Sequence, residues 1–144
     1  MDAMLNRLIL KYERGMKMKI LIIEDTALKF ASISRVLKNA GFTAIDSEKN
    51  LEDGLNAIEK SVKSDNRYGV IITDMWYPRE DRGPEEQCGL ELVDTVKARG
   101  YNIPVIICSN QQYRCENALG EVLYKENGDW DKELLISLVK KAYN

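Results

Sequence analysis

The chain has 144 residues, of which 44% are hydrophobic and 31% charged, and its formal net charge is −2. These values indicate one globular domain with a core of its own. The nearly balanced charge excludes a broad electrostatic attraction to nucleic acid or to anionic lipid. Histidine is absent, which excludes a histidine-based catalytic triad, histidine-ligated zinc and a phosphohistidine carrier.

The three cysteines, at positions 88, 108 and 115, form no CxxC pair and are odd in number. The sequence shows no secretory signal, so we expect reduced thiols and a cytoplasmic protein. No apolar stretch approaches the length of a membrane span. We therefore expect neither a membrane contact nor a direct contact with nucleic acid.

Residues 1–18 are expected to be an N-terminal extension, and residues 19–144 the domain itself. In the extension, apolar residues at helical spacing predict a short amphipathic helix: Met4, Leu5, Leu8, Ile9 and Tyr12. Methionines at positions 16 and 18 are alternative starts, so the sequence leaves open whether the extension is native.

Short apolar strands alternate with helices along the rest of the chain. Strands are expected at residues 19–23, 42–46, 70–73, 103–108 and 122–124. Helices are expected at residues 27–39, 51–62, 90–98, 111–119 and 129–142, the second capped by Asn50 and the last by Asp129. Continuously apolar strands need helices on both faces. The predicted fold is therefore α/β, a doubly wound five-stranded parallel sheet of order 2-1-3-4-5.

Two further local features are predicted from the same patterns. In the first helix, the buried stripe is expected at Leu28, Ile33, Val36 and Leu37. Residues 79–89, between the third strand and the third helix, are charged and contain glycine and proline without periodicity. We expect this segment to be an irregular loop.

Polar or charged side chains follow four of the five predicted strands. Glu24 and Asp25 follow the first strand, and Asp74 follows the third. Ser109 follows the fourth strand and Lys125 the fifth. In a sheet of order 2-1-3-4-5 these four strands are neighbours, and ligands bind at the carboxyl edge of such sheets. We therefore expect the five side chains to share one pocket.

Three carboxylates in one pocket repel one another and need a counterion. Oxygen ligands in a shallow site favour Mg²⁺. Asp74 is then placed to attack a phosphoryl group and form an aspartyl phosphate. Mg²⁺ and Lys125 would neutralise charge on the transferring oxygens, and the Ser109 hydroxyl would donate a hydrogen bond to one of them.

This set of residues resembles the receiver domain of two-component response regulators, over residues 19–144. The resemblance is carried by five motifs in order: Glu24-Asp25, Asp74 with Pro78 four residues later, Gly89-Leu90-Glu91-Leu92, Ser109 and Lys125. It implies a flavodoxin-like receiver fold with Asp74 as the phosphoacceptor, assisted by Ser109 and Lys125. It also implies Mg²⁺ as the cofactor, with four ligands: Glu24, Asp25, Asp74 and the backbone carbonyl of Trp76.

The resemblance implies a switch in a phosphorelay rather than a classical enzyme. The expected donor is a histidine kinase or a phosphotransfer protein, and small phosphodonors would also serve. Phosphorylation of Asp74 would change contacts with an output protein, which the sequence does not name. A homodimer stays open, as do the kinase and the pathway.

Two positions and the length of one segment depart from the family's pattern. Glu126 stands where the family has a proline after the lysine, so we expect a trans bond there. Val122 stands at the aromatic switch position, and Tyr124 lies on the same side of the strand by alternation. The segment from Ser109 to Lys125 is short, so the helix within it should be short or partly unwound.

These departures leave a second hypothesis open: a receiver-like interaction module that does not signal by phosphorylation. A flavodoxin-like cofactor binder is less favoured, because Glu24 and Asp25 would repel a phosphate. A phosphatase with an aspartyl nucleophile would want a second aspartate two residues after Asp74, where Trp76 stands.

Overall fold

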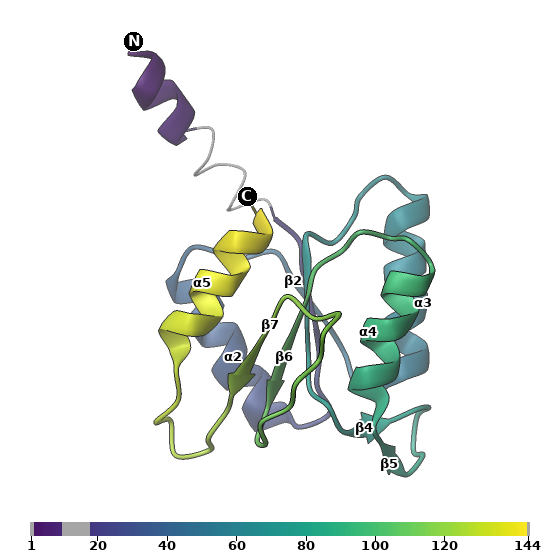
Figure 1. Ribbon diagram of the computed structural model, residues 1–144. Helices are drawn as coiled ribbons and strands as arrows, with labels where there is room; N and C mark the ends of the chain where they lie inside the picture. Colours follow the sequence, from purple (N-terminus) through teal and green to yellow (C-terminus); the bar gives the residue numbers. More distant parts are fainter. Residues whose placement is uncertain (1, 10–17, 144) are drawn as a thin grey trace.

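The computed structural model describes residues 2–9 and 18–143 (Figure 1). Residues 3–9 are helical. Positions 1 and 10–17 of the N-terminal extension, which include 12 and 16, lie outside the described residues. Within the described ranges, no helix combines the length and the apolar character that crossing a membrane requires.

A five-stranded parallel sheet forms the centre of the domain. Its strands are β1 (Ile20–Ile23), β2 (Ile45–Glu48), β3 (Val70–Thr73), β6 (Val105–Ser109) and β7 (Gly120–Leu123). The strand order is β2-β1-β3-β6-β7, with β6 and β7 as the fourth and fifth strands in sequence. The predicted order 2-1-3-4-5 is therefore confirmed.

Two layers of helices cover the sheet (Figure 1). One face carries α2 (Ala27–Asn39) and α5 (Lys132–Tyr143), and the other carries α3 (Leu51–Lys63) and α4 (Cys88–Ala98). Each face has its own apolar core, and every residue of β1, β3 and β6 is buried between the two. This double burial is why these strands have no polar alternation.

The sequence predicted a side-chain cap for two helices, and one of the two is confirmed. The side chain of Asn50 accepts a hydrogen bond from the Asp53 amide at 2.8 Å, so the predicted cap of α3 is confirmed. The last helix begins at Lys132 instead of following Asp129 directly. Asp131 makes the corresponding contact, accepting from the Leu134 amide at 2.9 Å. Two nearby aspartates offered the same signal, and the sequence prediction took the wrong one.

The predicted helix at residues 111–119 is wrong. Residues 110–119 join β6 to β7 without a helix, and within this segment Tyr113, Cys115 and Ala118 pack on the α3 and α4 side of the sheet. A parallel crossover must return along the whole length of a strand, and it normally needs a dozen or more residues when it contains a helix. A helix of ten residues would be only about 15 Å long and would use the whole segment. No residues would remain for the turns that join the helix to β6 and to β7.

The loop after Asp74 is more ordered than its composition indicates. Tyr77–Pro78 (β4) and Glu85–Glu86 (β5) pair as a short antiparallel ribbon. Tyr77 is fully buried, and its hydroxyl is hydrogen-bonded to the Thr73 hydroxyl at 2.9 Å. This contact ties the start of the ribbon to the end of β3, beside Asp74.

Candidate functional site

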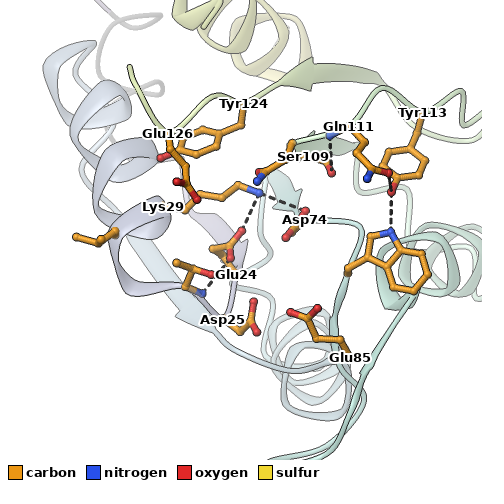
Figure 2. A pocket seen from close by; sticks show the side chains of 14 residues that line it. Glu24, Asp25, Lys29, Asp74, Glu85, Ser109, Gln111, Tyr113, Tyr124 and Glu126 are labelled. Carbon is orange, nitrogen blue, oxygen red and sulfur yellow. Dashed lines mark hydrogen bonds and ion pairs between the residues drawn. The ribbon is translucent and has the colours of Figure 1, made fainter. Parts of the chain in front are cut away.

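A cavity of about 630 Å³ opens at the carboxyl edge of the sheet. Figure 2 shows side chains from the ends of β1, β3 and β6 converging there, together with side chains from α2 and from the segment after β7. Four of the five strand-end residues chosen from the sequence line this cavity: Glu24, Asp25, Asp74 and Ser109. Trp76 lines it as well.

Asp74 is held by the backbone on both of its sides. Its amide donates to the carbonyl of Ile23 at 3.1 Å, which continues the pairing of β3 with β1. Its carboxylate oxygen Oδ1 accepts from the amide of Met75 at 2.7 Å. No described residue donates a hydrogen bond to the other oxygen, Oδ2, while the side chain keeps 16% of its surface exposed. One oxygen is therefore fixed and the other is available to a ligand.

The acidic cluster has the composition of a divalent-cation site. One carboxylate oxygen each from Glu24, Asp25 and Asp74 lies within 4.8 Å of the others. Burial raises the pKa of Glu24 above its ordinary value against the attraction of Lys29, and the Asp74 carboxylate raises it further. Holding these carboxylates close together costs free energy, because their charges repel one another. Clustered carboxylate oxygens of this kind suit Mg²⁺ or a similar cation.

The ammonium in the site belongs to Lys29, a residue that the sequence analysis did not select. Lys29 Nζ lies 2.9 Å from Glu24 Oε1 and 3.2 Å from Asp74 Oδ1, and only 7% of the side chain is exposed (Figure 2). Burial lowers the pKa of Lys29, but the carboxylates of Glu24 and Asp74 outweigh it, and the net shift is upward. Lys29 is therefore a buried cation in contact with the phosphoacceptor candidate.

The buried stripe predicted for the first helix was wrong at its first position. Leu28 is 83% exposed, whereas Lys29 is buried on the same face as Ile33 and Leu37. Lys29, Ile33 and Leu37 are spaced four residues apart, so the signal was present in the sequence. A lysine was not considered for the inner face because lysine is rarely buried without a partner. The two carboxylates supply that partner.

Lys125 is exposed and lies outside the set of side chains that line the cavity. Side chains alternate at the end of β7: Val122 and Tyr124 are buried, and Leu123 between them is partly exposed. The next position, 125, therefore faces away from the core. Tyr124 points into the cavity, and Lys29 Nζ lies 5.2 Å from the centre of its ring. The bond between Lys125 and Glu126 is trans, as expected.

Ser109 ends β6 and is almost completely buried at the floor of the cavity. Its hydroxyl oxygen accepts a long hydrogen bond, 3.5 Å, from the amide of Gln111. The hydroxyl proton is therefore free to be donated toward a ligand above Asp74.

A chain of hydrogen bonds closes one side of the cavity. The Trp76 indole donates to the Tyr113 hydroxyl at 2.6 Å, and that hydroxyl donates to the Gln111 side chain at 3.1 Å (Figure 2). Glu85 of β5 and Glu126 also line the cavity. Tyr113, Glu85 and Glu126 were not selected from the sequence, because each reaches the site from a connecting segment whose path the strand pattern does not fix.

Comparisons with known proteins identify the family and the fold. The sequence profile of the response regulator receiver domain matches residues 20–123. The fold is similar to chemotaxis response regulator CheY4 of Vibrio cholerae, with 18% identity, coverage of 87% of this chain and 98% of that chain, and a TM-score of 0.64. It is also similar to a LuxR-family DNA-binding response regulator from Staphylococcus aureus, with 22% identity, coverage of 88% and 99%, and a TM-score of 0.66.

A third similar structure is a complex of histidine kinase ThkA with response regulator protein TrrA, with 21% identity, coverage of 84% and 97%, and a TM-score of 0.62. At these identities the structural likeness shows the fold alone. No curated protein sequence matches the chain at a significant level. The profile spans most of the described domain, and so the chain belongs to the response regulator receiver domain family.

Proposed function

We propose that this protein is a phosphoacceptor switch of a two-component phosphorelay, in which Asp74 receives the phosphoryl group. The observation that carries the proposal is the placement of Asp74. Its free oxygen opens on a cavity that also holds two further carboxylates, a buried ammonium and a buried hydroxyl. A nucleophile, charge neutralisation and a hydrogen-bond donor are the parts that phosphoryl transfer needs.

The residues present fit a magnesium ion. We propose Glu24, Asp25, Asp74 and the backbone carbonyl of Trp76 as its ligands, because three of their oxygens already lie within 4.8 Å of one another. When bound there, Mg²⁺ supplies positive charge against the oxygens of the transferring phosphoryl group. The Oε2 atom of Glu24 accepts a hydrogen bond from the Thr26 amide at 2.9 Å. The backbone therefore helps to hold the Glu24 carboxylate in the proposed site.

The step at Asp74 is a displacement at phosphorus. Oδ2 of Asp74 forms a new bond to phosphorus, and the bond from phosphorus to the donor atom breaks, with the donor leaving with that electron pair. The Ser109 hydroxyl donates to a phosphoryl oxygen from the floor of the cavity. The product is a mixed anhydride, which water can hydrolyse to restore the carboxylate.

The phosphodonor that we propose is a histidine kinase or a phosphotransfer protein in the cytoplasm. Small phosphodonors would serve in vitro, since the chain itself supplies the acceptor and the charge. A similar receiver-fold protein, TrrA, has been solved in complex with a histidine kinase, which supports this choice of partner. Phosphorylation would then change contacts with an output protein, or with a second copy of this chain.

A second function, an interaction module that does not use phosphorylation, is favoured by two observations. The segment between β6 and β7 has no helix, and Val122 is a buried core residue rather than a mobile aromatic. These are the places where a phosphorylation signal would be read out. The intact arrangement around Asp74 argues for the first proposal.

One experiment separates the two. The protein is incubated with Mg²⁺ and acetyl phosphate, and its intact mass is measured; Asp74→Asn is the control. We expect wild type to gain one phosphoryl group and Asp74→Asn to gain none, with Asp25→Asn requiring more Mg²⁺. No gain in mass for wild type, together with no change in tryptophan fluorescence on adding beryllofluoride, would leave the interaction module as the function.

A further inference from the structure

A buried cation in the cavity lacks a well-directed acceptor. Only 7% of the Lys29 side chain is exposed, and its Nζ lies within ion-pair distance of two carboxylates. Lys29 Nζ is paired in charge with Glu24 Oε1 and Asp74 Oδ1, but no acceptor among the described residues meets hydrogen-bond geometry with it. The two ion pairs offset the cost of burying the ammonium. Its three protons are available to an acceptor that enters the cavity.

We propose that Lys29, and not Lys125, is the cation that binds the phosphoryl group on Asp74. The inference rests on the proposed function and assigns to α2 a role that the family resemblance assigns to the end of the fifth strand.

The first reason is position. Lys29 Nζ contacts Asp74 Oδ1, the oxygen that also accepts from the Met75 amide. A phosphoryl group on Oδ2 would project into the same cavity, with its oxygens in place to accept from Nζ. The ammonium therefore lies beside the carboxylate that is to be phosphorylated, before the phosphoryl group arrives.

The second reason is that Lys29 cannot turn away. Its stem runs along the buried face of α2, and its ammonium is bounded by Glu24 on one side and by the Tyr124 ring, 5.2 Å from Nζ, on the other (Figure 2). Lys125, in contrast, is exposed and outside the cavity lining. The inward position beside Lys125 is taken by Tyr124, which lines the cavity and packs against Trp130 at 5.3 Å between ring centres.

The third reason is charge. The carboxylates of Glu24, Asp25 and Asp74 and the ammonium of Lys29 sum to −3 + 1 = −2. One divalent cation balances the charge of this cluster, but Glu85 and Glu126 also line the cavity, so a phosphoryl group that enters meets further negative charge, which Lys29 offsets in part. Without Lys29 the site would attract a divalent cation more strongly and would repel a phosphoryl anion more strongly.

Removing Lys29 should therefore strengthen Mg²⁺ binding and slow phosphorylation. A variant that had lost its structure would be impaired in both. Lys29→Met is compared with wild type, with Lys125→Met and with Lys38→Met, an exposed lysine in the last turn of the same helix. For Lys29→Met we expect the rate of phosphorylation by acetyl phosphate to fall by about 100-fold or more. We expect Mg²⁺ affinity, followed by tryptophan fluorescence, to rise by about tenfold. Lys38→Met and Lys125→Met should change either quantity by no more than about twofold, because exposed charges are screened.

Folding is checked by circular dichroism and thermal melting, and Lys29→Arg supplies a variant that keeps the cation. A further readout, independent of turnover, is the ¹⁵N resonance of the Lys29 side chain, which should shift when beryllofluoride is added to the Mg²⁺-loaded wild-type protein. The role of Lys29 is overturned if wild type is phosphorylated and Lys29→Met is phosphorylated equally fast, or if Lys125→Met is the variant that fails. Either result leaves the proposed function standing. Absence of an adduct on wild type overturns both.

Discussion

Gly89 packs directly against the backbone that carries Asp74. A Cβ at position 89 would lie 2.7 Å from the Cα of Met75 and would collide with the carbonyl oxygen of Asp74. The Gly89 amide donates to the Met75 carbonyl at 2.9 Å. The start of α4 is thus hydrogen-bonded to the turn that positions Asp74, the proposed phosphoacceptor, and only a glycine allows this separation.

The first prediction concerns this contact. Gly89→Ala should lower the free energy of unfolding by about 1–3 kcal/mol, because neither backbone can move without disturbing the sheet or the helix. It should also slow phosphorylation of Asp74 by shifting its backbone. Urea denaturation measures the first effect and intact mass the second. The matched control is Gly54→Ala, also within a helix, where the added Cβ meets the flexible end of Ile23. Equal stabilities of the two variants would contradict the prediction.

The second prediction concerns hydrolysis of the aspartyl phosphate. Trp76 lines the cavity and is 42% exposed, and its indole is hydrogen-bonded to the Tyr113 hydroxyl. This hydrogen bond fixes the ring as a wall on the solvent side of the cavity. A wall there restricts the water that would attack phosphorus. Trp76→Asn should speed the decay of phosphorylated protein by about tenfold, equivalent to about 1.4 kcal/mol of barrier.

The decay is followed by the loss of mass after the phosphodonor is removed. Tyr113→Phe keeps both rings and removes the hydroxyl that receives the indole proton, so its decay rate should lie between those of wild type and Trp76→Asn. Decay at the wild-type rate in Trp76→Asn would show that Trp76 does not limit access of water.

The strand pattern predicted the sheet and four residues that line the cavity for a common reason. Buried parallel strands are short, continuous and apolar, so their ends are visible in the sequence, and side chains at those ends must meet. Glu24, Asp74 and Ser109 were found in this way. The segment at 110–119 was mistaken for a helix because local propensity does not register how far the chain must travel between two parallel strands.

Lys29 shows what strand ends cannot predict. It reaches the site from the first turn of α2, and its burial depends on Glu24 and Asp74, which are five and 45 residues away in sequence. Tyr124 and Lys125 show the complementary difficulty. Which of two neighbouring residues faces inward after the last strand depends on strand register, and a shift of one position exchanges them.

The third prediction concerns pH. Burial raises the pKa of Glu48, at the end of β2, and the carboxylates of Asp53 and Asp46 raise it further. Because the folded state binds this proton more tightly than the unfolded state, the stability it contributes is present below the ordinary glutamate pKa and is lost as pH rises through the raised value. Glu48→Gln should therefore raise the urea midpoint at about pH 7, and this gain should disappear near pH 4.

The gain should be small, since Glu48 is only partly buried and solvent screens its neighbours. Glu52→Gln is the matched control, because Glu52 is an exposed carboxylate in the first turn of α3. A gain for Glu48→Gln that is the same at both pH values would mean that packing, and not ionisation, separates it from wild type.

The last prediction tests the segment that replaces the expected helix. Burial raises the pKa of Cys108 to about 12 and raises that of Cys88, whereas Cys115 lies in the connecting segment with part of its surface exposed. The thiolate is the reactive form, and at pH 8 a thiol with a pKa near 12 is ionised in about one molecule in ten thousand. A thiol reagent should therefore modify one cysteine rapidly in the folded protein, and Cys115→Ser should abolish that phase while leaving the slow reaction of the other two. A rapid phase that persists in Cys115→Ser would contradict the prediction, because it would have to come from Cys88 or Cys108, which are buried.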